Sequence, residues 1–384
     1  MIFPGSTIGM LGGGQLGRMS ALAGRRMGYR FHAFDPSPHA CIRPVVEKYF
    51  LSDFQNYAQL KAFAEDIEVA TLEFENVPTE ALDFLLEKGI PVRPGPQALK
   101  ICQNRAEEKA FLHRNGLPCQ PNYPITNLDE LKSAFTQIGP PAVLKTAEFG
   151  YDGKGQVTIQ HKAELQDAWE RLATDSAVLE KWCDFTGEYS VIVARNPKGA
   201  VETFPLVENI HHDHILHTSI VPARISETAR EQAMQLAKEL AESMQLEGLI
   251  AVELFRTENE AWVINELAPR PHNSGHFSFD ACTTSQFEQH IRAVCDMPLG
   301  SPDLLCSAVM INLLGNYWPP HGTPSWHTLL EHPHSKLHLY DKGEPRVGRK
   351  MGHFTLLGNQ AEPLLNEANT LLETFLKSSS SKEH

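Results

Sequence analysis

The stretch that decides the fold is STIGMLGGGQLGRM, residues 6–19. An apolar strand runs into three glycines, and a helical pattern rich in alanine and methionine follows directly. Gly12, Gly14 and Gly17 have the GxGxxG spacing, and Asp35 ends the next predicted strand about 20 residues further along. This order is typical of a dinucleotide-binding βαβ unit. A tight strand-to-helix turn in any Rossmann-like domain has the same pattern, so both interpretations stay open here.

Strand and helix patterns alternate over the rest of this N-terminal part. Strands are expected at 29–34 and 69–74, and helices at 57–66 and 79–88. Such alternation predicts βαβ units and a parallel sheet. The turn-rich segment PVRPGP then closes the unit, so we expect one α/β domain over residues 1–97.

A second glycine-rich segment, EFGYDGKGQ, occupies residues 148–156 between two predicted strands. It is not a Walker A loop, because Gln156 follows its last glycine. A glycine hairpin that carries Lys154 can still fold over a triphosphate, and Lys145 on the preceding strand can reach the same phosphates. Taken by itself, the segment is better explained as an exposed hairpin with ordinary surface charges.

Two carboxylates stand inside a predicted β-hairpin. Glu253 lies among apolar residues of the first strand, and Glu266 lies near the end of the second. Buried carboxylates are costly unless they are paired or bind a metal, and two on adjacent strands suit Mg²⁺ shared with nucleotide phosphates. Solvent-facing positions on one side of the hairpin are the alternative. We favour the metal, because Arg270, Asn273 and Ser274 follow and add anion-binding groups.

The remaining elements follow from the same two periodicities. A helix that starts at Ser226 keeps alanine, leucine and methionine on one face at i, i+3, i+4 and i+7 spacing. Strands are expected at 142–146, 156–160, 177–183, 189–194, 249–255 and 261–267, and further helices at 98–115 and near 363–377.

Two more clusters suggest a ligand. Arg349 and Lys350 lie in the cationic segment PRVGRKMGH, which suits a phosphate-bearing substrate, although composition alone favours a solvated turn. The run HHDHILH at 211–217 suggests a metal, and we expect His212 and His214 to share one strand face. Since neither cysteine nor helical i, i+4 spacing accompanies the run, one histidine at a ligand is favoured over four at zinc.

The composition excludes several functional classes. Lys and Arg total 34 against 47 Asp and Glu, so the formal net charge of −13 disfavours coating nucleic acid or an anionic membrane. No apolar run reaches the roughly 18 residues of a membrane span, and the N-terminus does not have the pattern of a secretory signal. The seven cysteines form no CxxC pair, which indicates a reducing, cytoplasmic compartment.

The combination of these features is more specific than any one of them. A Rossmann-like domain, a lysine strand, a glycine lid and two strand carboxylates together resemble the ATP-grasp ligases. Within that superfamily the chain resembles the 5-(carboxyamino)imidazole ribonucleotide synthases of de novo purine biosynthesis. The resemblance spans nearly the whole chain and is carried by MLGGGQLGRM (10–19), TLEFENVP (71–78), EFGYDGKGQ (148–156), NELAPRPHNSGH (265–276) and GRKMGH (348–353).

The resemblance implies an α/β fold with an α+β grasp core. A Rossmann-like pre-ATP-grasp domain would span 1–97, and an ATP-grasp region would span 98–301, with its lid subdomain at about 118–180. A small C-terminal domain, 302–384, would complete the substrate site. The family also implies a cytoplasmic homodimer that acts on small molecules and uses neither nucleic acid nor a membrane.

The resemblance also assigns residues to ligands. ATP would contact Arg105, Lys145, Gly150, Tyr151, Asp152, Gly153, Lys154, Gly155, Gln156, Glu180, Lys181, Trp182, Cys183, Glu188, His211, Asn265 and Glu266. Mg²⁺ would be held by Glu253 and Glu266. Aminoimidazole ribonucleotide would contact Gly14, Gln15, Leu16, Glu73, Asn76, Tyr151, Asp152, His272, Asn273 and Ser274, with Lys342, Arg349 and Lys350 at its phosphate end.

The implied reaction is an ATP- and bicarbonate-dependent carboxylation without biotin. Phosphorylation of bicarbonate would give carboxyphosphate, with Mg²⁺, Lys145 and Arg270 neutralising the transferred group. The exocyclic amine would attack carboxyphosphate, or the CO2 released from it, and ADP and phosphate would leave. We expect Asp152 to orient or deprotonate the amine and Lys350 to be its electrostatic partner, with Arg270 completing the catalytic set.

Three other functions stay open on the sequence. Another ATP-grasp acceptor, as in the formate-using glycinamide ribonucleotide transformylases, is disfavoured by TLEFENVP and GRKMGH. A nicotinamide oxidoreductase built on residues 1–97 needs a hydride-transfer pocket that the sequence does not locate. A regulatory nucleotide-binding protein without turnover would lack the Mg²⁺ ligands, yet Glu253 and Glu266 are both present.

Overall fold

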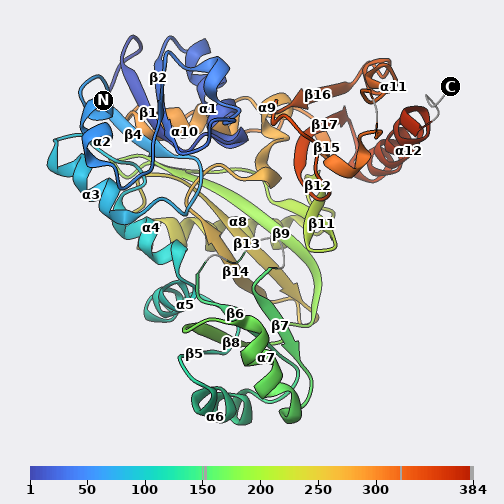
Figure 1. The fold of residues 1–384 in the computed structure, drawn as a ribbon. Helices are drawn as coiled ribbons and strands as arrows, with labels where there is room; N and C mark the ends of the chain where they lie inside the picture. Colours follow the sequence, from blue (N-terminus) through green and yellow to red (C-terminus); the bar gives the residue numbers. More distant parts are fainter. Residues whose placement is uncertain (149, 151–153, 321, 381–384) are drawn as a thin grey trace.

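The structure is a computed structural model that describes residues 1–148, 150, 154–320 and 322–380. Within these residues the chain forms three β-sheets, with helices packed against them (Figure 1). The N-terminal sheet lies at the top of this view and the sheet built from residues 122–181 lies at the bottom. Long strands of the largest sheet run between the two.

The N-terminal sheet is parallel, as the alternating pattern predicts, and helices pack against it. Of the four residues of strand β3 only Phe50 is buried, so no alternation marks this strand and the sequence did not reveal it. In spatial order the strands are β3 (Lys48–Leu51), β2 (Arg30–Asp35), β1 (Thr7–Leu11) and β4 (Val69–Leu72), joined by α1 (Gln15–Arg26), η1 (Arg43–Val45), α2 (Tyr57–Ala64) and α3 (Thr79–Glu87).

The single helix expected at 98–115 is wrong, because two helices stand there. Helix α4 (Pro96–Gln103) ends before Asn104, and α5 (Arg105–Arg114) begins after it. The Asn104 side chain accepts hydrogen bonds from the N–H groups of Ala106 and Glu107, so it caps a new helix. The break turns α5 toward the central cleft.

A small sheet of four strands in order β5-β8-β6-β7 forms a separate layer with its own apolar core. Strands β6 and β7 flank the glycine-rich segment, as the sequence predicts. The elements are β5 (Asn122–Ile125), α6 (Leu128–Ile138), β6 (Ala142–Thr146), β7 (Gln156–Ile159), η2 (Lys162–Glu164), α7 (Leu165–Leu172) and β8 (Ala177–Lys181).

The largest sheet has nine strands within the described ranges, in order β14-β13-β9-β11-β12-β15-β17-β16, with β10 paired to β9. It therefore joins the central part of the chain to its C-terminal part in one sheet. The strands are β9 (Phe185–Arg195), β10 (Val201–Thr203), β11 (Val207–His212), β12 (Ile215–Val221), β13 (Gly248–Thr257), β14 (Trp262–Ala268), β15 (Ser307–Leu314), β16 (Ser335–Leu339) and β17 (Lys350–Gly358).

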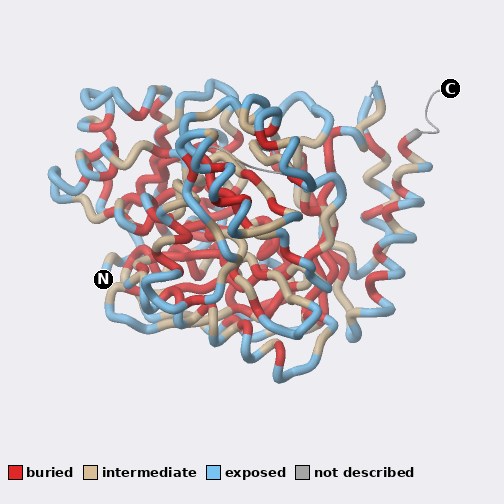
Figure 2. Tube along the Cα trace, turned by 90° about the horizontal axis from the view of Figure 1, so that it is seen from below, coloured by how far each residue is buried: buried red, intermediate tan, exposed pale blue. Residues whose placement is uncertain are grey.

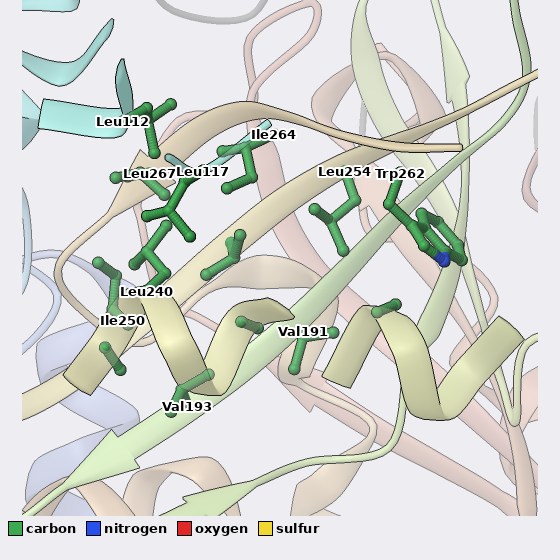
Figure 3. Close-up of a cluster of buried hydrophobic side chains, with 14 of the residues drawn as sticks. Leu112, Leu117, Val191, Val193, Leu240, Ile250, Leu254, Trp262, Ile264 and Leu267 are labelled. Atoms are coloured by element: carbon green, nitrogen blue, oxygen red, sulfur yellow. The ribbon is translucent and has the colours of Figure 1, made fainter. Parts of the chain in front are cut away.

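Helix α8 (Glu227–Ser243) covers this sheet, and its buried face matches the predicted periodicity. Ser226 caps it by accepting a hydrogen bond from the N–H of Ala229. Figure 3 shows Leu240 of the helix next to Ile250 of the sheet, and Val193 belongs to the same buried cluster. Burial of these apolar side chains stabilises the packing of the helix on the sheet.

A helix from late in the chain completes the core of the N-terminal sheet. Helix α10 (Gln286–Val294) places Ile291 and Val294 in the apolar core of the N-terminal sheet.

Buried residues run through the middle of the molecule and exposed ones surround them (Figure 2). In the described part of the chain, no helix is long and apolar enough to cross a bilayer. The other short elements are η3 (Asn273–Gly275), α9 (Ser278–Ala281), η4 (Gly315–Tyr317), α11 (Trp326–Leu330) and α12 (Ala361–Ser380).

Candidate active site

A cleft of about 870 Å³ opens where the three sheets meet. Residues that are far apart in the sequence converge there, and most of the expected site residues that the structure describes line it. These are Gln15, Leu16, Glu73, Asn76, Arg105, Lys145, Gly150, Lys154, Gln156, Glu180, Lys181, Trp182, Cys183, Glu188, His211, Glu253, Asn265, Glu266, Arg270, His272, Asn273 and Lys350.

The N-terminal glycine loop is occupied by carboxylates of the protein itself. Glu73 accepts a hydrogen bond from the N–H of Gly14 at 2.8 Å, and Asp35 accepts one from Gly13 at 2.9 Å. A Cβ atom on Gly14 would lie 2.5 Å from Glu73 Oε1, so only glycine allows this approach. In a dinucleotide fold these N–H groups would hold the pyrophosphate. A nicotinamide nucleotide would have to displace a buried carboxylate, so the dinucleotide interpretation loses its physical basis.

Arg270 is half-buried and paired with a carboxylate that the sequence analysis did not single out. Its guanidinium makes a two-pronged ion pair with Glu75, through Nε and, at 3.0 Å, through Nη2. Burial alone would raise the pKa of Glu75, but the Arg270 charge lowers it. The signal was present in TLEFENVP, where Glu75 stands two residues after Glu73. This pair fixes the guanidinium at the wall of the cleft.

Glu253 and Glu266 are direct cross-strand partners on β13 and β14. Opposed like charges are unfavourable, and here each carboxylate has one cationic or hydrogen-bonding neighbour. Arg105 Nη1 lies 3.1 Å from Glu266, and His272 Nε2 lies 3.2 Å from Glu253. Burial opposes ionisation of Glu253, but the His272 hydrogen bond and nearby cationic groups lower its pKa to about 2.

This donor set fits a hard divalent cation that is completed by phosphate oxygens. Two carboxylates facing each other with Asn265 beside them supply the oxygen ligands that Mg²⁺ prefers, and Mg²⁺ normally takes only one or two from protein. Over the ranges that the structure covers, no group of three or more His, Cys, Asp or Glu side chains could hold an ion. Two carboxylates leave most coordination positions of Mg²⁺ to other ligands, so the pair suits a metal that arrives with a nucleotide.

A buried ionic network lies where the small sheet meets the cleft. Lys145 Nζ is 2.8 Å from Glu180, and the fully buried Lys109 is 3.9 Å from the same carboxylate. Lys109 also pairs with Glu108 at 3.0 Å. Burial opposes ionisation of Glu180, but the charges of Lys109 and Lys145 lower its pKa to about 2. The sequence analysis missed Glu108 and Lys109, since nothing in a charged helix pattern marks a buried pair.

The Glu180 network predicts a loss of stability in acid. Because its pKa is lower in the folded state than the ordinary 4.5, Glu180 stabilises the fold above about pH 4.5 and ceases to do so as the pH falls toward 2. The shift corresponds to roughly 3 kcal/mol. The midpoint temperature of unfolding should therefore decrease as the pH is lowered from 5 to 3. Glu180→Gln should have a lower midpoint at pH 5 and a smaller decrease over this range. Glu231→Gln, at an exposed site, should retain the wild-type pH dependence.

The hinge between the small sheet and the large one, residues 180–183, is held by hydrogen bonds to backbone carbonyl groups. The Trp182 N–H donates to Pro141 O at 3.1 Å, and Lys181 Nζ donates to Pro140 O at 3.0 Å. Beside it, the rings of Phe185 and Phe255 stack with centroids 4.4 Å apart and line the cleft. The sequence analysis did not single out these two rings, because they pair across strands far apart in the chain.

The histidine run does not have the predicted arrangement. His214 lies in the turn between β11 and β12 with a positive φ of 64°, so the expectation that it shares a strand face with His212 is wrong. The His212 ring instead meets His217 at 4.5 Å between centroids. Two histidines of the run, His211 and His214, line the cleft, and His211 Nδ1 lies 2.8 Å from Glu188.

The cationic segment near the C-terminus reaches the cleft through Lys350. Lys342 is half-buried behind it, and burial, helped by the charges of Arg349 and Lys350, lowers its pKa to about 8. Of the expected site residues within the described ranges, five stand behind the lining: Gly14, Gly155, Ser274, Lys342 and Arg349. Tyr151, Asp152 and Gly153 lie outside the described residues.

Comparison with protein families covers almost the whole chain. Residues 5–103 match the ribonucleotide synthetase preATP-grasp domain, and residues 110–287 match the ATP-grasp domain. Residues 308–367 match the phosphoribosylaminoimidazole carboxylase C-terminal domain. The first match contains the N-terminal sheet, the second contains the small sheet and β9 to β14, and the third contains the C-terminal strands of the large sheet.

Individual relatives agree with the family matches. An N5-carboxyaminoimidazole ribonucleotide synthase of Bacillus subtilis is 41% identical over 371 residues, covering 96% of this chain and 95% of the relative. A bifunctional purine synthesis protein of Dictyostelium discoideum is 42% identical, and the match covers 92% of this chain but 37% of that longer protein.

Solved structures show the same likeness. A structure of N5-carboxyaminoimidazole ribonucleotide synthetase with ADP has a TM-score of 0.90 at 42% identity, with 97% of each chain covered. An Aspergillus clavatus N5-carboxyaminoimidazole synthase, solved with ADP and 5-aminoimidazole ribonucleotide, has a TM-score of 0.86 at 28% identity, covering 97% of this chain and 99% of that one.

Proposed function

The chain belongs to the N5-carboxyaminoimidazole ribonucleotide synthase family of ATP-grasp ligases, and we propose that its cleft holds Mg²⁺-ATP, bicarbonate and 5-aminoimidazole ribonucleotide side by side. The enzyme forms a C–N bond in purine biosynthesis: it carboxylates the amine of the ribonucleotide at the expense of ATP. The observation that carries the site assignment is the facing pair Glu253 and Glu266 beside Lys145 and Arg270.

ATP is assigned to the side of the cleft between the small sheet and the hinge. Lys145 and Arg105, which pair with Glu180 and Glu266 in the structure, are placed to neutralise phosphate oxygens. The adenine edge meets the hinge at 180–183, where backbone groups provide the contacts. Glu188, held by His211, is assigned to the ribose hydroxyls.

Glu253 and Glu266 are the residues that would hold Mg²⁺. When bound there, the ion neutralises phosphate charge and helps to align the transferred phosphoryl group. The protein contributes the orientation: Arg105 holds the Glu266 carboxylate, and His272 holds that of Glu253. Arg270, locked by Glu75, presents a fixed positive charge where carboxyphosphate would form.

The ribonucleotide is assigned to the opposite side, between the N-terminal glycine loop and the C-terminal cations. Gln15, Leu16 and Asn76 line that wall, and Lys350 lies across from them. Lys342 and Arg349, behind Lys350, add the positive charge that a phosphate end requires. The occupied glycine loop therefore serves as a wall of the substrate site.

Asp152 is proposed as the group that orients or deprotonates the attacking amine. Asp152→Asn should lower kcat by about 100-fold or more, because general-base catalysis contributes about that much. Asp129→Asn, at an exposed position of α6, is the matched control and should turn over normally. Near-normal turnover of Asp152→Asn at saturating substrate would refute the assignment.

The function is tested by ADP release with Mg²⁺-ATP and bicarbonate, measured with and without aminoimidazole ribonucleotide. Strong stimulation by the ribonucleotide, with labelled bicarbonate trapped in the product, is the expected result. ATP turnover without incorporation of label would indicate a different acceptor. Absence of ATP turnover under every condition would overturn the assignment.

Two features of the whole protein remain expectations of the same proposal. A homodimer is expected from the family, and sedimentation equilibrium measures it. A cytoplasmic location agrees with the seven cysteines, which all lie in the described part of the chain as free thiols.

A further inference from the structure

A continuous row of buried polar side chains runs behind the cleft and ends at His272. Ser219 Oγ donates to Asn209 Oδ1 at 3.0 Å, and Asn209 Nδ2 donates to Ser190 Oγ at 2.9 Å. Ser190 Oγ then donates to Ser274 Oγ at 2.7 Å, and Ser274 Oγ lies 2.9 Å from His272 Nδ1. The row links β12, β11 and β9 to the segment that carries His272.

These side chains have no other evident purpose in the fold. Ser190, Ser219 and Ser274 are fully buried, and Asn209 is 8% exposed. None of the four lines the cleft, and Ser190 stands directly opposite Glu253 in the register of β9 with β13. Burying polar groups is unfavourable unless all of them are hydrogen-bonded, so such a row stabilises the protein little compared with an apolar core. Stability therefore does not explain the row, and we look for its role in the one residue at which it ends, His272.

The direction of the hydrogen bonds is determined at the His272 end. The backbone N–H of Ser274 can only donate, and it lies 3.4 Å from His272 Nδ1. Nδ1 is therefore the acceptor nitrogen, and the Ser274 hydroxyl donates to it as well. Since a hydroxyl has one proton, Ser274 Oγ must accept from Ser190, which in turn must accept from Asn209. The same direction then holds along the whole row.

The other nitrogen of the ring faces a group that only accepts. His272 Nε2 lies 3.2 Å from Oε1 of Glu253, and an ionised carboxylate has no proton to give. Both sides of the ring thus require the proton on Nε2. We propose that Ser190, Asn209 and Ser219 are positioning residues that hold His272, through Ser274, as an Nε2–H donor aimed at Glu253.

The consequence concerns the proposed metal site, on which this part of the inference rests. A histidine that is held as a donor orients Glu253 and cannot act as a base or bind the ion in its place. Outer hydrogen bonds of this kind typically change metal affinity about 10- to 100-fold. The row would thus fix the position of the Glu253 carboxylate relative to strands β9, β11 and β12.

The test is the tautomer of His272 in the protein without ATP or Mg²⁺. We would record ¹⁵N–¹H correlations of histidine-labelled protein at about pH 8, where free imidazole is neutral. The His272 signals are identified by their loss in His272→Gln. The wild type should show Nε2 protonated and Nδ1 unprotonated. In Ser190→Ala the Ser274 hydroxyl no longer has to donate to Nδ1 and can accept from Nδ1–H, so only the long 3.4 Å contact from the Ser274 N–H still opposes that tautomer and the two nitrogen shifts should move toward each other.

Two variants serve as controls. Ser190→Thr keeps the hydroxyl and should restore the wild-type shifts. Ser20→Ala removes an equally buried hydroxyl that lies 3.1 Å from the Nδ1 of another histidine, His290, and should leave the His272 signals unchanged. Mg²⁺ titration of the ADP complex should show about tenfold weaker binding for Ser190→Ala and none of this loss for Ser20→Ala.

The outcomes separate this inference from the proposed function. Protonated Nδ1 in the wild type would overturn it, as would unchanged His272 shifts in Ser190→Ala. If Ser190→Ala does not fold, Asn209→Asp, which has nearly the same size but removes the donor to Ser190, must shift the His272 tautomer or the proposal fails. A correct tautomer in a protein that does not carboxylate the ribonucleotide would refute only the proposed function.

Discussion

Replacing either Glu253 or Glu266 by Gln should lower kcat by about 100-fold or more. The amide keeps the size of the side chain but removes one of two charges that face each other across β13 and β14. Mg²⁺ typically contributes several kcal/mol of charge stabilisation to phosphoryl transfer, and each 1.36 kcal/mol is a factor of about ten. The loss should appear in ADP release at saturating ATP and ribonucleotide.

The two variants should also differ from each other. Glu266→Gln removes the partner of Arg105, which then competes with Mg²⁺ for the phosphates. In Glu253→Gln the new amide oxygen is neutral and can still accept the hydrogen bond from His272 Nε2–H. Raised Mg²⁺ should therefore recover more activity in Glu253→Gln. Glu258→Gln, in the exposed turn of the same hairpin, is the control and should match the wild type. Normal turnover in both cleft variants would remove the metal assignment.

Lys109→Met should lower the stability of the protein by about 3–5 kcal/mol, the usual effect of breaking a buried ion pair. The ammonium is 2% exposed, pairs with Glu108 and donates to the carbonyl of Asn265 at 2.5 Å. Glu108 in turn accepts from the N–H of Leu267 at 2.8 Å. The pair therefore holds β14 on both sides of Glu266.

Scanning calorimetry measures the effect as a lower unfolding midpoint. The double variant Glu108→Gln with Lys109→Met should regain part of the loss, since it leaves one fewer uncompensated charge inside the protein. Lys132→Met removes an exposed lysine that pairs with Asp129 at 3.3 Å, and it should change stability by less than about 1 kcal/mol. An unshifted midpoint for Lys109→Met would show that the buried pair does not hold the strand.

Much of the fold could be predicted from local pattern. The βαβ alternation of the first domain, the helix capped by Ser226 and the carboxylate hairpin all depend on periodicity within a short window, and the structure confirms them. The errors share a local cause as well. A single polar residue, Asn104, divides a helix by capping its second half, and a tight turn at His214 reverses the strand that was expected to continue.

The candidate site was predicted less completely than the fold. The spacing of residues along a sequence does not show which side chains will pair in the folded protein. Most residues that the sequence assigned to the site do line the cleft. Their partners Glu75 and Lys109, and the stacked rings of Phe185 and Phe255, lie in ordinary segments and were missed.

The sequence by itself determined the family, the type of reaction and the residue types available for it, since motif residues carry their chemistry wherever they are placed. Only the tertiary structure decided which charges meet. It seats Glu73 in the glycine loop, closes Arg270 onto Glu75 and aligns Ser219, Asn209 and Ser190 behind His272. Ion pairs and hydrogen bonds act over a few ångströms, and that proximity arises only when distant strands are packed into one core.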